Sequence, residues 1–546
     1  MSIADQKGAR PNVVIILNDD MGYSDIGCYG GEVETPNLDR LAFAGLRYSQ
    51  FYNTARCSPS RASLLTGLHP HQTGIGILTY DTGPEGYTGD LGTNCVTMAE
   101  VLREAGYRTY LSGKWHVAKS LTEPSPSWPL QRGFDEFYGT IIGAGSFYHP
   151  NTLTRGNENV EHEAINDPDF FYTDAISDQA VDFIRDHARG HADAPFFQYV
   201  AYTAPHWPLH AHDEDIAKYK GRFDAGWDTL REERLERLVR AGMIDPSWML
   251  TDRDPTQPAW RDAEEKAWLL RCMEVYAAQI DRMDQGIGRI LDALEETGQR
   301  DNTMIVFLSD NGACAEDIPE GVPVRELVDN LMIAQEKTRD GRLVRFGNDR
   351  SIMPGAEDTY QSYETAWANL SNAPFRLYKH WVHEGGISTP LIVHWPQGIG
   401  EAGGIRHTPG QLPDLMATVL EVTGAAYPAE YKGNAILPCE GTSLVPSFED
   451  DGAGRGPLFW EHEGNSAVRV GKWKLVRKYP GPWELYDMEA DRTEMNDLAA
   501  GNPERVEELK ALYQTWADRC GVIDRETILD YLTSQAGTAF WEKEEA

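Results

Sequence analysis

The sequence predicts an α/β fold in which helices sandwich a large, mostly parallel sheet, followed by a smaller subdomain built on an antiparallel sheet and a helix. Apolar, β-branched runs such as residues 13–17 alternate with helical segments, which is typical of a parallel sheet. Polar clusters follow several of these runs, where ligands of such sheets bind. After about Gly452, short strands replace this alternation. We therefore expect an α/β domain over residues 1–452 and a C-terminal subdomain with a helical tail over residues 453–546.

Local signals place the elements of the first domain in order. Thr35 and Pro36 open a helix that Gly45 closes, and the capping box of Thr97 and Glu100 opens another. Periodicity predicts the remaining elements: strands over residues 46–51, 109–111, 195–202, 303–308 and 390–395, helices over 174–187, 263–297 and 414–423, a polar, partly helical insertion over 214–262, and a loop region over 314–372 that frames the site.

The last part of the chain reads as a small antiparallel sheet. Residues 466–477 alternate between apolar and polar, residues 480–482 form a turn, and residues 483–487 form another strand. An amphipathic helix over residues 504–520 is expected to pack on this sheet. The tail after Thr527 is expected either to cap the fold or to join two subunits. Both a monomer and a homo-oligomer are therefore compatible with the sequence.

Charge and cysteine content exclude several classes of protein. The chain has 546 residues and a net charge of −35, which disfavours a nucleic-acid binder or a protein that docks on anionic membranes. Its seven cysteines are scattered and lack C-x-x-C spacing, which argues against a disulfide framework and favours a reducing compartment. Residues 1–10 carry no apolar core of signal-peptide length. We therefore expect a cytoplasmic protein, with a periplasmic location left open.

Five polar clusters each follow a predicted strand. They begin at Asp19, Cys57, Lys114, His206 and Asp310. Because the carboxyl ends of parallel strands share one edge of a sheet, these clusters are predicted to converge on one site. This argument does not place the candidate Lys379 at the site, because Lys379 precedes its nearest predicted strand.

The segment around Cys57 has the features of an anion site. Ser58 is a good helix cap, Pro59 suits the first helical position, and Gly67 suits the residue after the helix. Cys57 is therefore expected at or just before the helix N-terminus, in a capped turn outside the core. Arg61 lies one turn on, roughly on the same face. A sulfur and a guanidinium at a helix start suit anion chemistry, although a lone cysteine is usually structural.

Hard oxygen ligands follow two of the strands. Asp19 and Asp20 follow the strand over residues 13–17, and Asp310 and Asn311 follow the strand over 303–308. Such ligands suit calcium or magnesium rather than zinc. Taken alone, an adjacent carboxylate pair at a strand end caps a turn more often than it binds metal. Because two pairs occur in the same kind of place, a metal site becomes the better interpretation.

These segments together resemble the type I sulfatases, a family of the alkaline phosphatase superfamily. Cys57 to Arg61 match C-x-P-S-R, followed by x-x-L-L-T-G, and Gly113 to His116 match G-K-W-H. The metal candidates lie within N-x-x-x-x-L-N-D-D and S-D-N-G. His206 and Lys379 match the family's second active-site histidine and second lysine. The resemblance implies an alkaline-phosphatase-like fold.

The resemblance also implies two cofactors. In this family a maturation enzyme converts the cysteine, here Cys57, to Cα-formylglycine. One calcium ion per subunit, in preference to magnesium or manganese, is then implied at Asp19, Asp20, Asp310 and Asn311, with the formylglycine oxygen at position 57 completing the coordination.

Roles for the other site residues follow from the same resemblance. Lys114 and His116 would contact the sulfate and the formylglycine hydroxyl, and Arg61, Lys114 and Lys379 would balance the sulfuryl oxygens. Asp310 would help to deprotonate the attacking hydroxyl, and His206 or Lys379 would protonate the leaving oxygen. His116 is the expected base when the aldehyde re-forms. His210 is a weaker candidate, and His383 and Glu384 are expected to shape a loop.

The function implied is that of an arylsulfatase that cleaves small, aryl sulfate monoesters. The alternative is a phosphonate monoester hydrolase or phosphodiesterase of the same superfamily, which also uses C-x-P-x-R. A non-catalytic anion-binding relative is disfavoured because no expected ligand is lost. A two-zinc enzyme is disfavoured because a second cluster of His and Asp ligands is not evident in the sequence.

Overall fold

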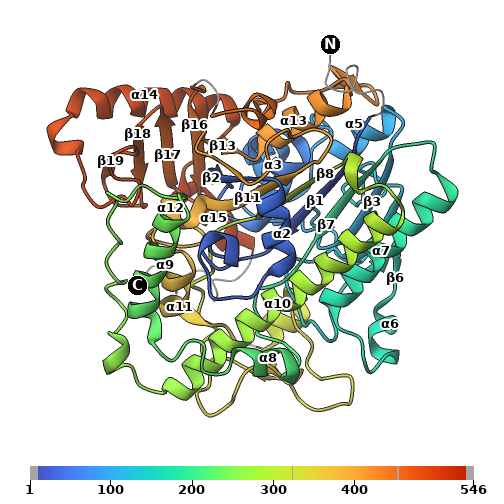
Figure 1. The fold of residues 1–546 in the computed structure, drawn as a ribbon, viewed down its shortest axis with the longest axis horizontal. Helices are drawn as coiled ribbons and strands as arrows, with labels where there is room; N and C mark the ends of the chain where they lie inside the picture. The colour runs from blue at the N-terminus through green and yellow to red at the C-terminus, as the bar shows by residue number, and fades with distance from the viewer. Residues whose placement is uncertain (1–9, 323, 452–453, 536–546) are drawn as a thin grey trace.

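The fold is that of a computed structural model, which describes residues 10–322, 324–451 and 454–535 (Figure 1). Its centre is an eleven-stranded sheet with the order β12-β2-β11-β8-β1-β7-β3-β4-β5-β6, in which β13 also pairs with β2. The strands are β1 Asn12–Asn18, β2 Leu46–Tyr52, β3 Arg108–Gly113, β4 Glu136–Thr140, β5 Leu153–Arg155, β6 Glu158–Asn159, β7 Phe196–Ala201, β8 Thr303–Ser309, β11 Ser388–His394, β12 Gly404–Arg406 and β13 Gly410–Gln411.

The sheet is mixed, with a parallel centre. Strands β8, β1, β7, β3 and β4 pair in parallel in this order, so that β1 lies between β8 and β7. Strand β11 runs antiparallel to both of its neighbours, β2 and β8. The predicted mostly parallel sheet is confirmed. The apolar run of β11 gives no sign of its direction, because buried strands of either direction read alike.

Helices cover both faces of the sheet, because β1 presents alternate residues to two cores. Val14 and Ile16 pack with the helices α2 Pro36–Ala44, α7 Tyr172–Gly190 and α10 Lys266–Glu296. Val13, Ile15 and Leu17 pack with α3 Cys57–Thr66, α5 Met98–Glu104 and α13 Pro413–Thr423. Figure 1 shows α2 and α10 in front of the sheet. A strand buried on both faces explains why residues 13–17 are continuously apolar.

Shorter elements complete this part. The insertion over residues 214–262 contains α8 Asp213–Tyr219 and α9 Gly226–Arg240, as predicted. The predicted loop over residues 314–372 is only partly a loop, because it ends in the buried helix α11 Glu364–Ser371. It also contains the strand pair β9 Arg345–Phe346 and β10 Thr359–Tyr360. The remaining elements are α4 Pro70–Thr73, α6 Glu161–Asn166, α12 Glu384–Ile387, β14 Glu430–Tyr431 and β15 Asn434–Ala435.

A second, four-stranded antiparallel sheet follows, at the upper left of Figure 1. Its strands are β16 Leu458–His462, β17 Asn465–Val470, β18 Trp473–Arg477 and β19 Trp483–Asp487, and α14 Pro503–Cys520 packs on one face. In the last helix, α15 Arg525–Gln535, Ile528 packs against Ile77 and Tyr87, so this part of the tail caps the first domain. The predicted boundary at residues 452–453 and the tail after residue 535 lie outside the described residues.

A buried ion network joins the two sheets. Lys474 of β18 donates to Glu384 at 2.8 Å and lies 2.8 Å from Glu494, and Arg492 donates to the other oxygen of Glu384 at 2.8 Å. All four side chains are fully buried. Glu384 was expected to shape a loop. In the structure its carboxylate accepts hydrogen bonds from two cationic side chains of the C-terminal part, Lys474 and Arg492.

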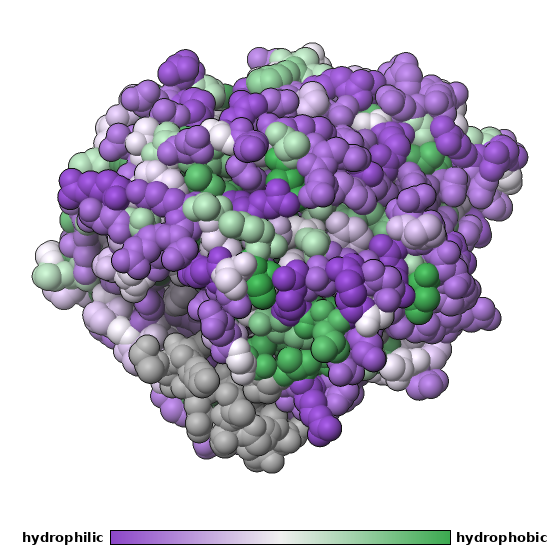
Figure 2. Space-filling model, turned by 90° about the horizontal axis from the view of Figure 1, so that it is seen from below, coloured by the Kyte–Doolittle hydropathy of each residue, from purple (hydrophilic) through white to green (hydrophobic). Residues whose placement is uncertain are grey.

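The surface is mostly hydrophilic. Figure 2 shows one face on which hydrophilic residues surround a hydrophobic area in the lower half. This agrees with a solvated acidic surface for a chain of net charge −35. Within the described residues, no helix combines the length and the apolar character that crossing a membrane requires.

Candidate active site

Helix α3 begins two residues earlier than predicted. Cys57 is its first residue and Arg56 its cap, so the prediction that Ser58 caps the helix is wrong. The hydroxyl of Ser60 instead closes the preceding turn, because it accepts a hydrogen bond from the Thr54 amide at 3.0 Å. All ten residues of α3 are buried, and Cys57 is 3% exposed, not outside the core as expected. Gly67 ends the helix as predicted, in the left-handed conformation.

The polar clusters continue the ladder of the sheet beyond the strand ends. The amide of Asp310 donates to the Asn18 carbonyl at 3.1 Å, and the amide of Lys114 donates to the Ala201 carbonyl at 2.8 Å. The amide of Asp19 likewise donates to the Ala204 carbonyl at 3.1 Å. These backbone bonds fix the clusters after β1, β3, β7 and β8 against one another. The predicted convergence at one edge of the sheet is therefore what the structure shows.

Arg61 organises the deepest part of the site. Its guanidinium donates to the Asp310 carboxylate at 2.8 and 3.2 Å and to the Lys114 carbonyl at 3.1 Å. It also lies 3.5 Å from the Asp19 carboxylate, to which Lys114 donates a short hydrogen bond. None of these four side chains is exposed to solvent. This arrangement fixes the orientation of Asp310 and Asp19.

Asp20 organises the second half of the site. Its carboxylate accepts from Asn311 at 2.6 Å and from the ammonium of Lys379 at 3.0 Å, and it lies 3.3 Å from Nε2 of His206. Lys379 reaches this point although its segment follows no strand. The backbone explains this, because the Lys379 amide donates to the Ala313 carbonyl at 3.1 Å, just beyond the β8 cluster.

Two histidines contact the residues of the site. The Nδ1 atom of His116 is 3.4 Å from the Cys57 sulfur. Burial is the main reason that the pKa of His116 lies well below its usual range, and the positive charges of Lys114 and Arg61 lower it further. The ring is therefore neutral near pH 7. His206 Nδ1 lies 2.6 Å from the Trp207 carbonyl and must donate to it, which leaves Nε2 to accept from Lys379 at 3.3 Å.

The donor set fits a hard cation. Oδ1 of Asp19 and Oδ1 of Asn311 are buried, and within the described residues they have no hydrogen-bond partner. Buried acceptors without partners are costly, and a cation satisfies them. Burial, and secondly the negative charge of the neighbouring Asp19, raise the pKa of Asp310 to about 7. This shift shows that carboxylates lie close together here. Asp19, Asp20 and His206 also offer ligand atoms within 4.8 Å of one another. Oxygen atoms dominate this set, which favours calcium or magnesium.

A cavity of about 310 Å³ leads to these residues. Cys57, His116, His206 and Lys379 line its inner end. Its walls are mostly apolar and aromatic, formed by Leu78, Tyr80, Leu121, Ile142, Trp207, Ile318, Val322, Leu327, Leu331, Ile333 and Tyr360. The walls come from the segments after α4, β3, β4 and β7 and from the region over 314–372, which frames the site as predicted.

Sequence reasoning missed two charged residues at the cavity. Glu316 accepts from Arg56 at 2.7 Å and from the Trp207 ring at 2.9 Å. Burial alone would raise the pKa of Glu316, but Lys379 and Arg56 outweigh it and hold that pKa well below its usual range. Neither residue belongs to a recognised motif, and the only available signal was the position of Arg56 directly before Cys57.

One weaker candidate lies elsewhere. Nε2 of His210 is 2.7 Å from the Thr359 carbonyl, and Nδ1 accepts from the Phe147 amide at 3.3 Å. With both nitrogens engaged by backbone, its role is structural. The seven cysteines are free thiols, which confirms that no disulfide framework is present.

Comparison with known proteins gives consistent results. The model of the family described as "Sulfatase" matches residues 11–425, and that of "N-sulphoglucosamine sulphohydrolase, C-terminal" matches residues 375–517. The chain is 34% identical to the arylsulfatase of Klebsiella aerogenes, over 80% of this chain and 91% of the relative. It is 31% identical to an uncharacterised sulfatase of Schizosaccharomyces pombe, over 94% of both chains.

Among solved structures, a similar one is that of Ps i-CgsB in complex with k-i-k-neocarrahexaose. It has a TM-score of 0.65 and 24% identity and covers 98% of this chain and 100% of that chain. At this identity the likeness concerns the fold alone. It agrees with the large mixed sheet and the C-terminal antiparallel sheet described above.

Proposed function

The chain belongs to the sulfatase family, and from this premise we propose that it hydrolyses small sulfate monoesters whose leaving group is apolar, above all aryl. The observation that carries this proposal is the apolar and aromatic wall of the cavity that ends at Cys57. A sugar presents many hydroxyl groups, each of which loses free energy when it is buried without a partner. An aromatic ring instead gains free energy against such walls. The similarity to an arylsulfatase supports the same substrate class.

The nucleophile is proposed to come from Cys57. Its oxidation to formylglycine would supply, when hydrated, an oxygen nucleophile where the thiol now lies. His116, 3.4 Å from that sulfur and neutral, is placed to accept and return a proton at this position. Asp310, which Arg61 holds in a fixed orientation, would take a proton from the same hydroxyl.

The cation would be held by Asp19, Asp20, Asp310 and Asn311. When bound, it supplies positive charge that stabilises developing negative charge and lowers the pKa of an adjacent hydroxyl. The chain's own cations act alongside it. Arg61 and Lys114 fix Asp310 and Asp19, and they line the deep end of the site with donors.

Protonation of the leaving oxygen is proposed for His206 and Lys379. They lie 3.3 Å apart, and both line the cavity. Burial would lower the pKa of Lys379, but Asp20 and Glu316 outweigh it and keep the ammonium charged. The charged ammonium of Lys379 can therefore donate to an ester oxygen in the cavity, with Nε2 of His206 beside it as an acceptor.

Charge balance favours a substrate with one negative charge. The carboxylates of Asp19, Asp20 and Asp310 are offset by the side chains of Arg61, Lys114 and Lys379. The cation would then contribute two positive charges, of which the deprotonated hydroxyl proposed at position 57 would offset one, so that one positive charge remains to balance the substrate. A sulfate monoester is a monoanion, whereas a phosphate monoester approaches two charges at neutral pH. Phosphodiesters and phosphonate monoesters are also monoanions, so they are the expected side activities and, if preferred, the alternative function.

A substrate panel tests this proposal. We expect kcat/KM for an aryl sulfate to exceed that for the same aryl group on a phosphate monoester, a phosphodiester or a phosphonate. We also expect it to exceed that for a 6-sulfated amino sugar, because the cavity walls offer the sugar few partners. Steady-state kinetics on the matured enzyme measure this. Preference for the sugar sulfate would contradict the apolar-pocket argument, and preference for the diester or phosphonate would replace the function.

Weakening the proposed cation site is a second test of the function. Asp310→Asn keeps the shape of the side chain but removes one charge from the donor set and from the contact with Arg61. We expect both calcium affinity and kcat to fall, by on the order of 10²-fold or more in rate. Elemental analysis, with calcium added back to chelator-treated enzyme, measures this.

Asp301→Asn, an exposed aspartate at the opposite end of β8, is the matched control and should change neither quantity. Stoichiometric zinc in this site, or a metal-free enzyme of undiminished rate, would contradict the assignment.

A further inference from the structure

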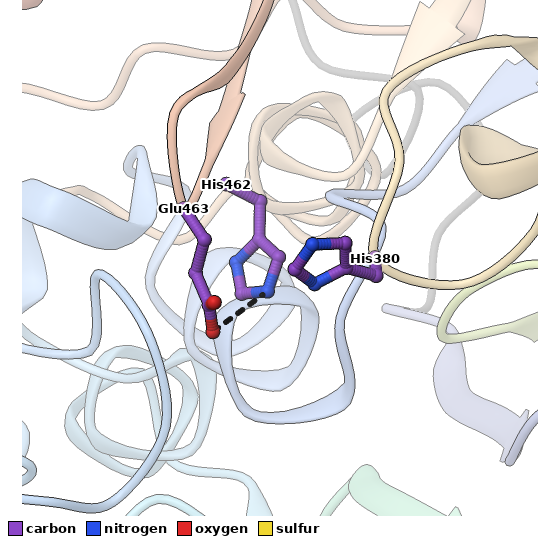
Figure 3. Close-up of side chains that lie close together, drawn as sticks. All are labelled: His380, His462 and Glu463. Carbon is purple, nitrogen blue, oxygen red and sulfur yellow. Dashed lines mark ion pairs between the residues drawn. The ribbon is translucent and has the colours of Figure 1, made fainter. Parts of the chain in front are cut away.

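A second group of metal-ligand side chains lies between the two sheets. It consists of His380, His462 and Glu463, whose ligand atoms all lie within 4.8 Å of one another. His380 comes from the loop that carries Lys379, and the other two come from the end of β16 and the turn that follows it. Figure 3 shows the His462 ring between the Glu463 carboxylate and the His380 ring. This group could not be predicted from the sequence, because His380 is distant along the chain from His462 and Glu463 and the three residues match no motif.

His462 is the unusual member. Its side chain is not exposed, and within the described residues neither ring nitrogen has a hydrogen-bond partner. A buried imidazole without partners is costly, and it calls for a ligand. Nε2 lies 3.6 Å from Oε1 of Glu463, which is too long for a hydrogen bond. Two ligands of a tetrahedral ion with bonds of 2.0–2.1 Å lie roughly 3.4 Å apart, which is close to this spacing.

The backbone holds the group in place. Both His380 and Glu463 adopt positive φ, 90° and 49°, which is uncommon for residues with a side chain and is often found at functional sites. The His380 amide donates to the Ala55 carbonyl at 2.7 Å, and Asn465 donates to the His380 carbonyl at 3.4 Å. The second oxygen of Glu463 lies 2.7 Å from Arg525, which orients the carboxylate and leaves Oε1 facing His462.

We propose that His380, His462 and Glu463 form a second metal site, which binds a borderline transition-metal dication of the zinc class. Two imidazoles and one carboxylate are the donor set that such ions prefer, in contrast to the oxygen set at Asp19 and Asp310. Three protein ligands leave a fourth position for water. The ion ties the β16–β17 hairpin to the loop of Lys379, so it stabilises the contact between the C-terminal sheet and the wall of the active site.

Zinc and cobalt binding by the full-length protein tests this proposal. The protein is freed of metal with a chelator, supplied with calcium, and titrated with Co²⁺, whose visible absorption reports tetrahedral coordination, and separately with Zn²⁺. Wild type and Asp310→Asn are expected to retain one equivalent of zinc and to show the cobalt band, because the second site does not use Asp310. His462→Ala and Glu463→Gln are expected to lose both.

Control variants keep the result interpretable. His191→Ala removes an exposed histidine after α7 and should retain the equivalent of zinc. If His462→Ala does not fold, His380→Ala replaces it, because His380 is only half-buried. Zinc should raise the thermal midpoint of wild type but not of the folded ligand variants. Absence of zinc from wild type, its retention in the ligand variants, or its loss with Asp310→Asn alone would each overturn the proposal.

Discussion

Replacing Cys57 by alanine is expected to abolish sulfate ester hydrolysis. The residue begins helix α3 at the inner end of the cavity, with His116 at 3.4 Å and the Asp310 cluster behind it. Alanine offers no atom from which an aldehyde, and then a nucleophilic hydroxyl, can form. Loss of the nucleophile in another hydrolase costs on the order of 10⁶ in kcat. Initial rates with an aryl sulfate measure the loss.

Two controls accompany this variant. Cys439→Ala removes a thiol at the opposite end of α3, where its sulfur lies against the Gly67 carbonyl, and should retain full activity. Because Cys57 is buried, its replacement should also cost about 1 kcal/mol of stability, which circular dichroism and urea unfolding would register. Mass spectrometry of the wild-type peptide with residue 57 should show the aldehyde. Full activity of a protein whose residue 57 is an unmodified thiol would contradict the assignment.

Replacing Lys474 by methionine is expected to cause a large loss of stability. Its ammonium lies 2.8 Å from both Glu384 and Glu494, and none of these groups is exposed. Methionine fills the volume but removes the positive charge, so two carboxylates remain buried, of which Glu384 keeps Arg492 as a partner. Breaking a buried pair in this way costs about 3–5 kcal/mol. The free energy of unfolding, from urea titration followed by tryptophan fluorescence, measures this.

The same hairpin supplies the control for this variant. Lys472, two residues earlier, pairs with Asp487 at 2.6 Å on the exposed surface. Lys472→Met should leave the unfolding midpoint nearly unchanged, because solvent screens such pairs. Equal losses for the two lysines would show that the network contributes no more than an exposed ion pair.

Much of the fold was predictable because hydrophobic pattern and turn chemistry agree. The continuous apolar run of β1 predicted a central strand, and the capping box of Thr97 and Glu100 is present with both of its hydrogen bonds. The start of α3 was not predictable from Ser58, because Ser60 closes the preceding turn instead. Local propensity is a weak guide where a tertiary contact offers the same backbone group a better partner.

The positions of the site residues could be predicted where these residues follow strand ends, but not where they lie in other loops. Asp19, Lys114 and Asp310 could be placed together because parallel strands end at one edge. Lys379 could be assigned only by resemblance, since a backbone bond to Ala313, and no strand, brings it there. His462 and Glu463 arrive through packing of a second sheet, a long-range contact that leaves no periodic signal in the sequence.

The complete burial of α3 has a consequence for the order of events during synthesis. An enzyme that oxidises Cys57 cannot reach a side chain that is 3% exposed within a helix whose ten residues are all buried. The oxidation proposed for Cys57 would therefore have to precede closure of the fold, in which Arg492 donates to Glu384 and to the Ser49 carbonyl. At about 5–20 residues per second, the ribosome takes roughly 20–90 s to travel from Cys57 to Arg492. Translation speed over this interval thus limits what fraction of the chains acquires a nucleophile.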